Sequence, residues 1–245
     1  MAEIQTKRRG AGARIALAVL VILVIIAGVI LLVFRVRSIE ISGTRRVSET
    51  DIKKIIRFDE CHGNTLLLWL MNRKIDVSDI DMIESMDMHI AGPRTVRINV
   101  EEQLLVGFFR DGGNCHYVNE NGLIILSQKG ELEGVPEFIG LEVSDLSQGA
   151  YVTASDEAAL ADMLQIAAIV QETELSIEKL EVDKDGHYIA SWQKIKALLG
   201  RNVYMNEKIG ELKSLQQQPE VQGQAGTFHL EEYDATKDSI IFTKE

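Results

Sequence analysis

Residues 86–100 read MDMHIAGPRTVRINV and carry the clearest pattern in the chain. Apolar residues alternate with polar ones in residues 86–90 and again in residues 96–100, and Gly92-Pro93 separates the two runs. Because side chains point to opposite faces along a strand, each run has one apolar face. The stretch therefore predicts a β-hairpin with an apolar face that other elements must cover.

The segment before the hairpin supplies that cover. Ile39 and Ile41 alternate as in a short strand, which bends at Gly43. Ser48 and Asn64 are helix N-cap residues, and each precedes apolar residues at helical spacing. We therefore expect an α+β unit in the order strand, helix, helix, strand, strand, with both helices on one face of a small sheet. Residues 77–82 predict either a further helical turn or the lead-in to the hairpin.

Residues 15–34, IALAVLVILVIIAGVILLVF, contain no charge and no proline. About 20 apolar residues in a helix cross a bilayer, so this segment predicts a transmembrane helix. A cleaved signal peptide is the main alternative. A signal peptide would have a shorter apolar core followed by small residues. This segment instead ends at Phe34, and the next residue is Arg35.

Basic residues flank both ends of the apolar segment, so the charge difference that sets its orientation in the membrane is small. Those before it are Lys7, Arg8, Arg9 and Arg14, and those just after it include Arg35 and Arg37. A short basic tail favours the cytoplasm, while a long acidic domain crosses the membrane largely regardless of its charge. We therefore expect a cytoplasmic N-terminus and an extracytoplasmic bulk.

The second half of the chain is rich in strand patterns. Strands are expected in residues 104–109, 116–119, 123–126, 176–182, 187–192, 195–199, 227–230 and 239–242. Helical patterns cover residues 154–175 and 206–216. Val135-Pro136 and Gly140 predict a loop. These patterns predict a mixed, β-rich domain with flanking helices.

Charge and cysteine content exclude several classes of function. The 245 residues have a formal net charge of -11, and so acidic a chain lacks the clustered Lys and Arg that nucleic acid requires. Its two cysteines, Cys61 and Cys115, are too few for a disulfide scaffold. They could form one bridge in an exported protein, but two unrelated free thiols are the favoured interpretation.

The order of these features resembles the FtsQ/DivIB family of bacterial cell-division proteins. The likeness covers nearly the whole chain and rests on six short motifs after the apolar segment, each of which is weak alone. They lie at residues 36–43, 47–52, 92–102, 117–122, 197–209 and 228–233. One departure is Glu102-Gln103-Leu104, where many members have Glu-Arg followed by Pro.

The resemblance implies a basic cytoplasmic tail at residues 1–14, a transmembrane helix at 15–34, a POTRA docking domain at 35–105 and a β domain at 106–245. It implies a non-enzymatic, bitopic scaffold of the divisome at the division septum. Such a scaffold binds other single-span division proteins, FtsL-like and FtsB/DivIC-like, and helps control septal peptidoglycan synthesis. A septal peptidoglycan synthase is a further candidate partner, the lipid bilayer is contacted through the anchor, and no cofactor is implied.

Family members bind partners through the last strands of the β domain, which implies partner-binding roles for Tyr233, Ile240, Ile241 and Phe242. Residues 239–242 carry no charge, which is unusual for a protected sheet edge. An open edge can accept a partner strand through its backbone groups. The alternative is that Ile240 and Phe242 are buried and Ile241 alone is exposed.

Catalytic and metal-binding interpretations find little support in the residues. Cys61-His62 and Cys115-His116 repeat a pair, but adjacent residues of a strand point to opposite faces and rarely reach one ion. No signature of a cysteine nucleophile, phosphate loop or serine hydrolase is present. We therefore expect no catalytic, cofactor or metal site. A membrane-anchored extracytoplasmic hydrolase or thiol enzyme of the envelope is the alternative function, and a POTRA-type transport accessory is a third.

Two arginines, two glutamates and one tryptophan are interpreted from their places in the sequence. Arg45 and Arg46, just past the bend, could contact lipid head groups or wall polymer, although a solvated turn explains them equally well. Glu101 and Glu102 are expected to be strand-end charges that block unwanted pairing. Trp192 falls in an apolar pattern and is expected in a core rather than on a sugar-binding surface.

Overall fold

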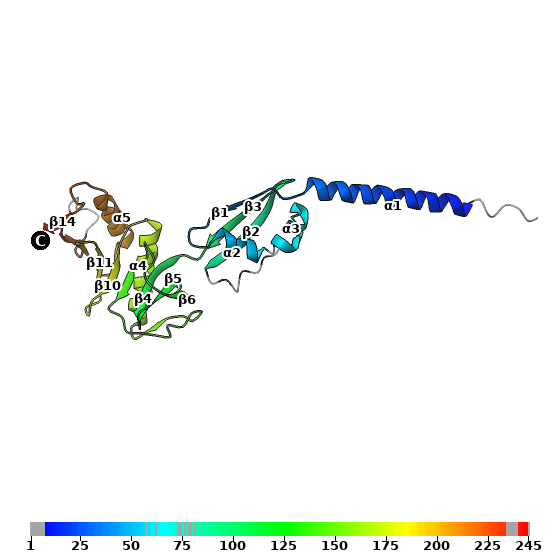
Figure 1. Cartoon of the computed structure of the whole chain (residues 1–245). Coiled ribbons are helices and arrows are strands. Elements are labelled where there is room, and N and C mark those ends of the chain that lie inside the picture. Colours follow the sequence, from blue (N-terminus) through cyan, green and yellow to red (C-terminus); the bar gives the residue numbers. More distant parts are fainter. Residues whose placement is uncertain are drawn as a thin grey trace, which may run out of the picture. The chain divides into compact units, whose positions relative to one another are not determined.

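The computed structural model describes residues 8–56, 58–61, 63–72, 75, 77, 80, 82–233 and 240–244. These residues form two compact units, which divide between Glu102 and Gln103 (Figure 1). The first unit contains an N-terminal helix and a small α+β domain, and the second contains a large mixed sheet with helices packed on it. Residues 1–7 of the expected basic tail and residues 78, 79 and 81 of the expected lead-in lie outside the described residues.

Helix α1 (Arg8–Val33) contains a stretch, Gly12–Val33, that is long and apolar enough to cross a membrane. Its 22 residues extend about 33 Å, close to the ~30 Å thickness of a bilayer's hydrocarbon core. None of its most apolar window is buried against protein. The helix ends at Val33, one residue before the expected end, although the Phe34 N–H still donates to the Ile30 carbonyl at 3.0 Å.

The rest of the first unit follows the expected order of elements. Strand β3 is central in its sheet, with β1 parallel to it on one side and β2 antiparallel on the other. The elements are β1 (Ser38–Ser42), α2 (Glu49–Ile55), the short 3-10 helix η1 (Phe58–Cys61), α3 (Thr65–Met71), β2 (Ile83–Gly92) and β3 (Thr95–Glu102). Helices α2 and α3 contribute Ile52 and Leu68 to a core shared with the sheet. The expected α+β sandwich is confirmed.

Local side-chain chemistry explains where these helices begin. Ser48 Oγ accepts from the Asp51 N–H at 3.2 Å, so α2 starts directly after it. Asn64 Oδ1 accepts from the N–H groups of Leu66 and Leu67, both at 3.0 Å, and thereby starts α3. Both caps were recognisable because a cap and the N–H groups that it satisfies are neighbours in sequence.

The bend after β1 depends on a glycine and on a distant carboxylate. Gly43 has φ +88°, and a Cβ there would lie 2.0 Å from the Val100 carbonyl oxygen. Glu102 Oε1 then accepts from the N–H groups of Arg45, Arg46 and Val47 at 2.9, 2.9 and 2.8 Å. Glu102 is therefore a structural acceptor that fixes the turn, as well as the strand-end charge expected from the sequence.

The second unit is built on one nine-stranded sheet among the described residues. Its strand order is β14-β13-β12-β11-β10-β7-β4-β5-β6, and β8 and β9 form a separate pair. The strands are β4 (Leu105–Asp111), β5 (Asn114–Asn119), β6 (Ile124–Lys129), β7 (Glu137–Ile139), β8 (Val143–Ser144), β9 (Thr153–Ala154), β10 (Lys179–Val182), β11 (Tyr188–Trp192), β12 (Ile195–Gly200), β13 (Gly226–His229) and β14 (Ile241–Lys244). The helices are α4 (Glu157–Glu172) and α5 (Met205–Gln216).

Strand β7 corrects the expectation of a loop at residues 135–140. It lies in the middle of the sheet, parallel to β10 on one side and to β4 on the other. Phe138 points its ring at the place where Gly107 has no side chain, since a Cβ there would lie 2.1 Å from it. Three residues between a proline and a glycine show no periodicity of their own, so only these distant partners define the strand.

Helix α4 covers the sheet with one apolar face. Leu160, Met163 and Ala167 are buried in the core of this unit, at the helical spacing expected from the sequence. The helix begins later than the expected 154–175, because Asp156 Oδ1 accepts from the Ala159 N–H at 3.0 Å and caps its start, and it ends at Glu172.

The division between the two units falls between Glu102 and Gln103, just before β4 begins. Glu102 is bonded to the turn of the first unit, whereas Gln103 Oε1 accepts from Asn119 Nδ2 of the second at 3.3 Å. The side chains on either side of the division thus belong to different units.

Candidate partner-binding site

Strand β14 forms one edge of the large sheet. Its described partner is β13, to which it runs antiparallel, with Phe228 opposite Phe242 and His229 opposite Ile241. No other described strand pairs with its outer side. The backbone N–H and C=O groups on that side are therefore available to a further strand, as far as the described residues show.

The side chains at this edge have different environments. Phe242 is partly buried, and its ring centroid lies 4.5 Å from that of Phe228. Ile240 is also partly buried and packs on the same core, whereas Ile241 is 66% exposed. Ile241 is thus the apolar side chain that this edge presents to solvent, and Ser239 lies outside the described residues.

Tyr233 lies elsewhere, beyond the end of β13. It is partly buried, and its N–H donates to the Leu230 carbonyl at 3.1 Å. It helps line a pocket of about 310 Å³, together with His187, Gly200, Arg201, Val203, Tyr204, Lys208 and Glu231. The structure therefore brings Ile240, Ile241 and Phe242 together at the sheet edge and places Tyr233 on a nearby hollow at the end of the preceding strand.

Sequence reasoning missed the buried lysine of this hollow. Lys208 is 2% exposed, and its Nζ donates to the Leu199 carbonyl at 2.5 Å. Burial lowers the pKa of Lys208, while the nearby Glu231 carboxylate raises it. Lys208 falls at the buried positions of α5 beside Met205, Ile209 and Leu212, so helical spacing was the signal that could have found it.

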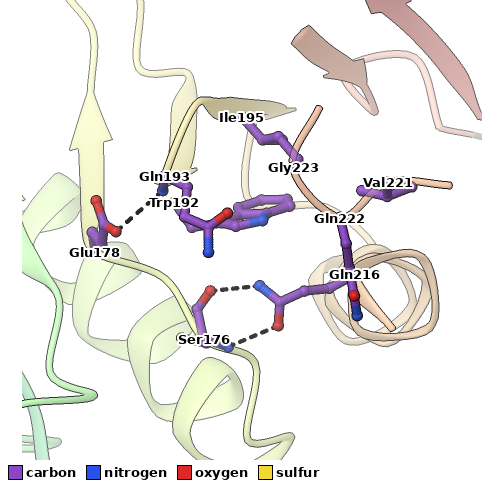
Figure 2. Close-up of a pocket in the computed structure, with 9 residues that line it drawn as sticks. All are labelled: Ser176, Glu178, Trp192, Gln193, Ile195, Gln216, Val221, Gln222 and Gly223. Atoms are coloured by element: carbon purple, nitrogen blue, oxygen red, sulfur yellow. Dashed lines mark hydrogen bonds between the residues drawn. The ribbon is translucent and has the colours of Figure 1, made fainter. Parts of the chain in front are cut away.

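A second pocket, of about 340 Å³, opens beside Trp192 (Figure 2). Its walls are held by internal hydrogen bonds. The Gln216 side chain accepts from the Ser176 N–H at 3.2 Å and donates to the Ser176 carbonyl at 2.7 Å, and Glu178 Oε1 accepts from the Gln193 N–H at 3.1 Å. Trp192 itself is buried and stacks on Phe228, which confirms its place in the core.

The cysteines lie in separate units, and both are buried and free. Cys61 Sγ lies 3.6 Å from Met71 Sδ, and burial raises the pKa of its thiol, with a smaller contribution from Glu60. Cys115 lies in β5, where its neighbour His116 is occupied by a 2.9 Å hydrogen bond to Ser127 Oγ. Each thiol thus lies within the core of its own unit.

Metal-ligating residues do not gather in the part of the chain that the structure describes. No group of three or more His, Cys, Asp or Glu residues there is placed to hold an ion. His62, one member of the repeated Cys-His pair, lies outside the described residues.

Residues 34–103 identify the small α+β domain of the first unit. These residues match the family model for the POTRA domain, FtsQ-type. The first unit carries an FtsQ-type POTRA domain. The apolar helix α1 directly precedes this domain. A search of curated proteins found no match.

The FtsQ-type domain indicates the general role of the protein. It indicates a cell-division scaffold that acts through protein–protein interaction, and members of this family are generally non-enzymatic. Together with α1, it indicates a single-pass membrane protein. The α+β fold of the whole chain, with an apolar helix, a POTRA domain and a larger mixed sheet, is the one expected from the sequence.

Proposed function

We propose that the FtsQ-type chain is a non-enzymatic, single-span scaffold of the bacterial divisome. It lies at the division septum, with its N-terminus in the cytoplasm and both units outside. There it binds FtsL-like and FtsB/DivIC-like proteins and helps control septal peptidoglycan synthesis, with a septal synthase as a further partner. The observation that carries this proposal is the FtsQ-type POTRA domain directly after a helix long enough to span a membrane.

The charges support the proposed orientation, and the domain layout is proposed with it. A basic tail at residues 1–14 stays in the cytoplasm, residues 15–34 cross the membrane, and the POTRA domain (35–105) and β domain (106–245) follow outside. The short tail contributes Lys7, Arg8, Arg9 and Arg14 to the orientation bias, whereas the long acidic remainder counts little. Reporter fusions at either end test this arrangement, and a cytosolic C-terminal reporter would contradict it.

Partners bind at the edge of β14 by adding a strand. The outer backbone groups of Ile241–Lys244 supply the hydrogen bonds of such an addition, and the exposed Ile241 side chain supplies one apolar contact. Tyr233 and the hollow of about 310 Å³ beside it receive a side chain of the same partner. Phe242 and Ile240 act indirectly, because their packing on the core holds the strand in place.

Capture of an FtsB/DivIC-like partner by the full-length chain tests this mechanism. We expect removal of residues 239–245 to lower capture at least about tenfold, which corresponds to about 1.4 kcal/mol of binding free energy. Ile241→Glu should lower it as well, whereas Ile241→Val should retain it, because the added strand is held mainly by backbone groups. Tyr151→Glu, at a residue that is 62% exposed and distant in sequence, is the matched control. Unchanged capture by the truncated chain would reject the edge mechanism.

The cellular role has its own readout. A fluorescent fusion of the full chain should gather at midcell in dividing cells, and it should do so with Cys61→Ser and Cys115→Ser as well. Uniform distribution over the membrane would contradict a septal scaffold. Loss of function in both cysteine variants, with folding intact, would favour the alternative of an envelope thiol enzyme.

A further inference from the structure

Helix α3 of the POTRA domain exposes an apolar face. Leu66, Leu67, Leu70 and Met71 are 37, 36, 56 and 47% exposed, while Thr65 and Leu68 are fully buried. At about 100° per residue, the four exposed side chains span a face about 140° wide. Four large apolar side chains on one face of a seven-residue helix exceed what scattered surface residues require, so the face needs an occupant.

Hydrogen bonds fix this helix beside the end of α1. The Thr65 N–H, in the first residue of α3, donates to the carbonyl of Phe34, the residue directly after α1, at 2.6 Å. The Val36 N–H donates to the Gly63 carbonyl at 2.7 Å, and Arg35 and Asn64 form an isolated antiparallel bridge. The start of α3 therefore lies at the level where the chain leaves α1, whatever the direction of that helix.

Basic side chains surround the same point. Arg35 and Arg37 follow α1 and are exposed. The Arg37 and Ser38 N–H groups both donate to the Arg94 carbonyl, at 2.8 and 3.2 Å, which brings the turn of the β2–β3 hairpin there as well. Arg94 is exposed too. Three guanidinium groups beside an apolar face match a lipid surface, where phosphates lie directly above the acyl chains.

We propose that α3 lies in the interface of the membrane that α1 crosses. Its exposed leucines and Met71 enter the boundary between head groups and acyl chains, and Arg35, Arg37 and Arg94 contact lipid phosphates. The POTRA domain is thereby held flat against the bilayer rather than hanging from a flexible tether. This inference rests on the part of the proposed function in which α1 spans a membrane, and on no division partner.

The structure also reassigns the basic residues that contact lipid. Arg45 and Arg46 follow the opposite end of β1, where their N–H groups bind Glu102. A five-residue strand extends about 16 Å, so this end is displaced from the exit of α1 by roughly that distance. Head-group contact therefore belongs to Arg35, Arg37 and Arg94 instead of to Arg45 and Arg46.

Depth measurements on the full chain in vesicles test this proposal. An environment-sensitive fluorophore is attached at Leu70→Cys, or at Arg45→Cys as the matched control, in vesicles of phosphatidylethanolamine and phosphatidylglycerol. The two natural thiols are buried and do not compete for the label in the folded protein. We expect emission at shorter wavelength, with quenching by bromine-labelled lipid, from position 70 and water-like emission without quenching from position 45.

Second variants separate membrane contact from a folding defect. Leu66→Glu combined with Leu67→Glu, in the Leu70→Cys background, should abolish the quenching while carbonate extraction leaves the chain in the vesicles. Water-like emission from position 70 in the unaltered background would overturn the proposal, as would a wavelength shift that requires an added protein partner. Release of the chain by carbonate would instead contradict the membrane span in the proposed function.

Discussion

At the residue scale, Lys208 is a basic side chain buried inside the second unit. It lies on the buried face of α5, beneath the hollow that Tyr233 borders, and one carbonyl accepts its hydrogen bond. A protonated lysine in such a place loses most of its hydration, which is why burial lowers its pKa. Burying this charge lowers the free energy of unfolding, so its effect on stability can be measured.

Lys208→Met should change the pH dependence of unfolding. Because the folded-state pKa is lowered, the unfolded chain binds more protons than the folded protein between that value and about 10.4. The free energy of unfolding should therefore rise with pH across this window in the unaltered chain and stay flatter in Lys208→Met. Chemical denaturation in detergent at several pH values measures the difference, with the exposed Lys196→Met as control. Parallel curves for Lys208→Met and the unaltered chain would contradict it.

At the scale of elements, the sequence predicted those whose signal lies within a few residues of its effect. It did not predict those that depend on partners distant in the chain. The N-caps of α2 and α3 and the β2–β3 hairpin were predictable because each signal lies within a few residues of its effect. Strand β7 was not, because its three residues become a strand only between β4 and β10, which approach from distant parts of the chain. The same reason hid the hollow beside Tyr233, whose lining residues come from three separated segments.

The first residue of α3 offers a test of how a buried, unpaired hydroxyl affects stability. Thr65 Oγ1 is buried and has no hydrogen-bond partner among the described residues. Thr65→Val removes this hydroxyl with little change of shape, and we expect it to raise the free energy of unfolding of the first unit by about 1 kcal/mol. Denaturant titration measures the change, and Thr95→Val, at a partly exposed strand position, should be near neutral. Destabilisation by Thr65→Val would show that the hydroxyl has a partner, such as an ordered water.

At the scale of the whole molecule, the described residues form two hydrophobic cores that share no residue. Ile52, Leu68 and Ile98 belong to the first, and Met163 and Leu180 belong to the second. Each core is closed by side chains of its own unit, so the two units should unfold as separate cooperative transitions.

Leu68→Ala and Leu180→Ala distinguish the two transitions. Both leucines are 0% exposed, and each truncation should cost about 2–5 kcal/mol. We expect Leu68→Ala to lower the midpoint of one calorimetric transition and Leu180→Ala to lower the other. A single transition shifted equally by both variants would show that the units unfold together.

The position of β7 also determines when the second unit can be completed during synthesis. The strand gains its β10 neighbour only after residues 179–182 have emerged, some forty residues later in the chain. Until then β7, at the side of β4, has no strand on its other side, and α4 lacks the part of the sheet that β10 supplies. Nascent chains arrested before Lys179 should therefore be sensitive to protease.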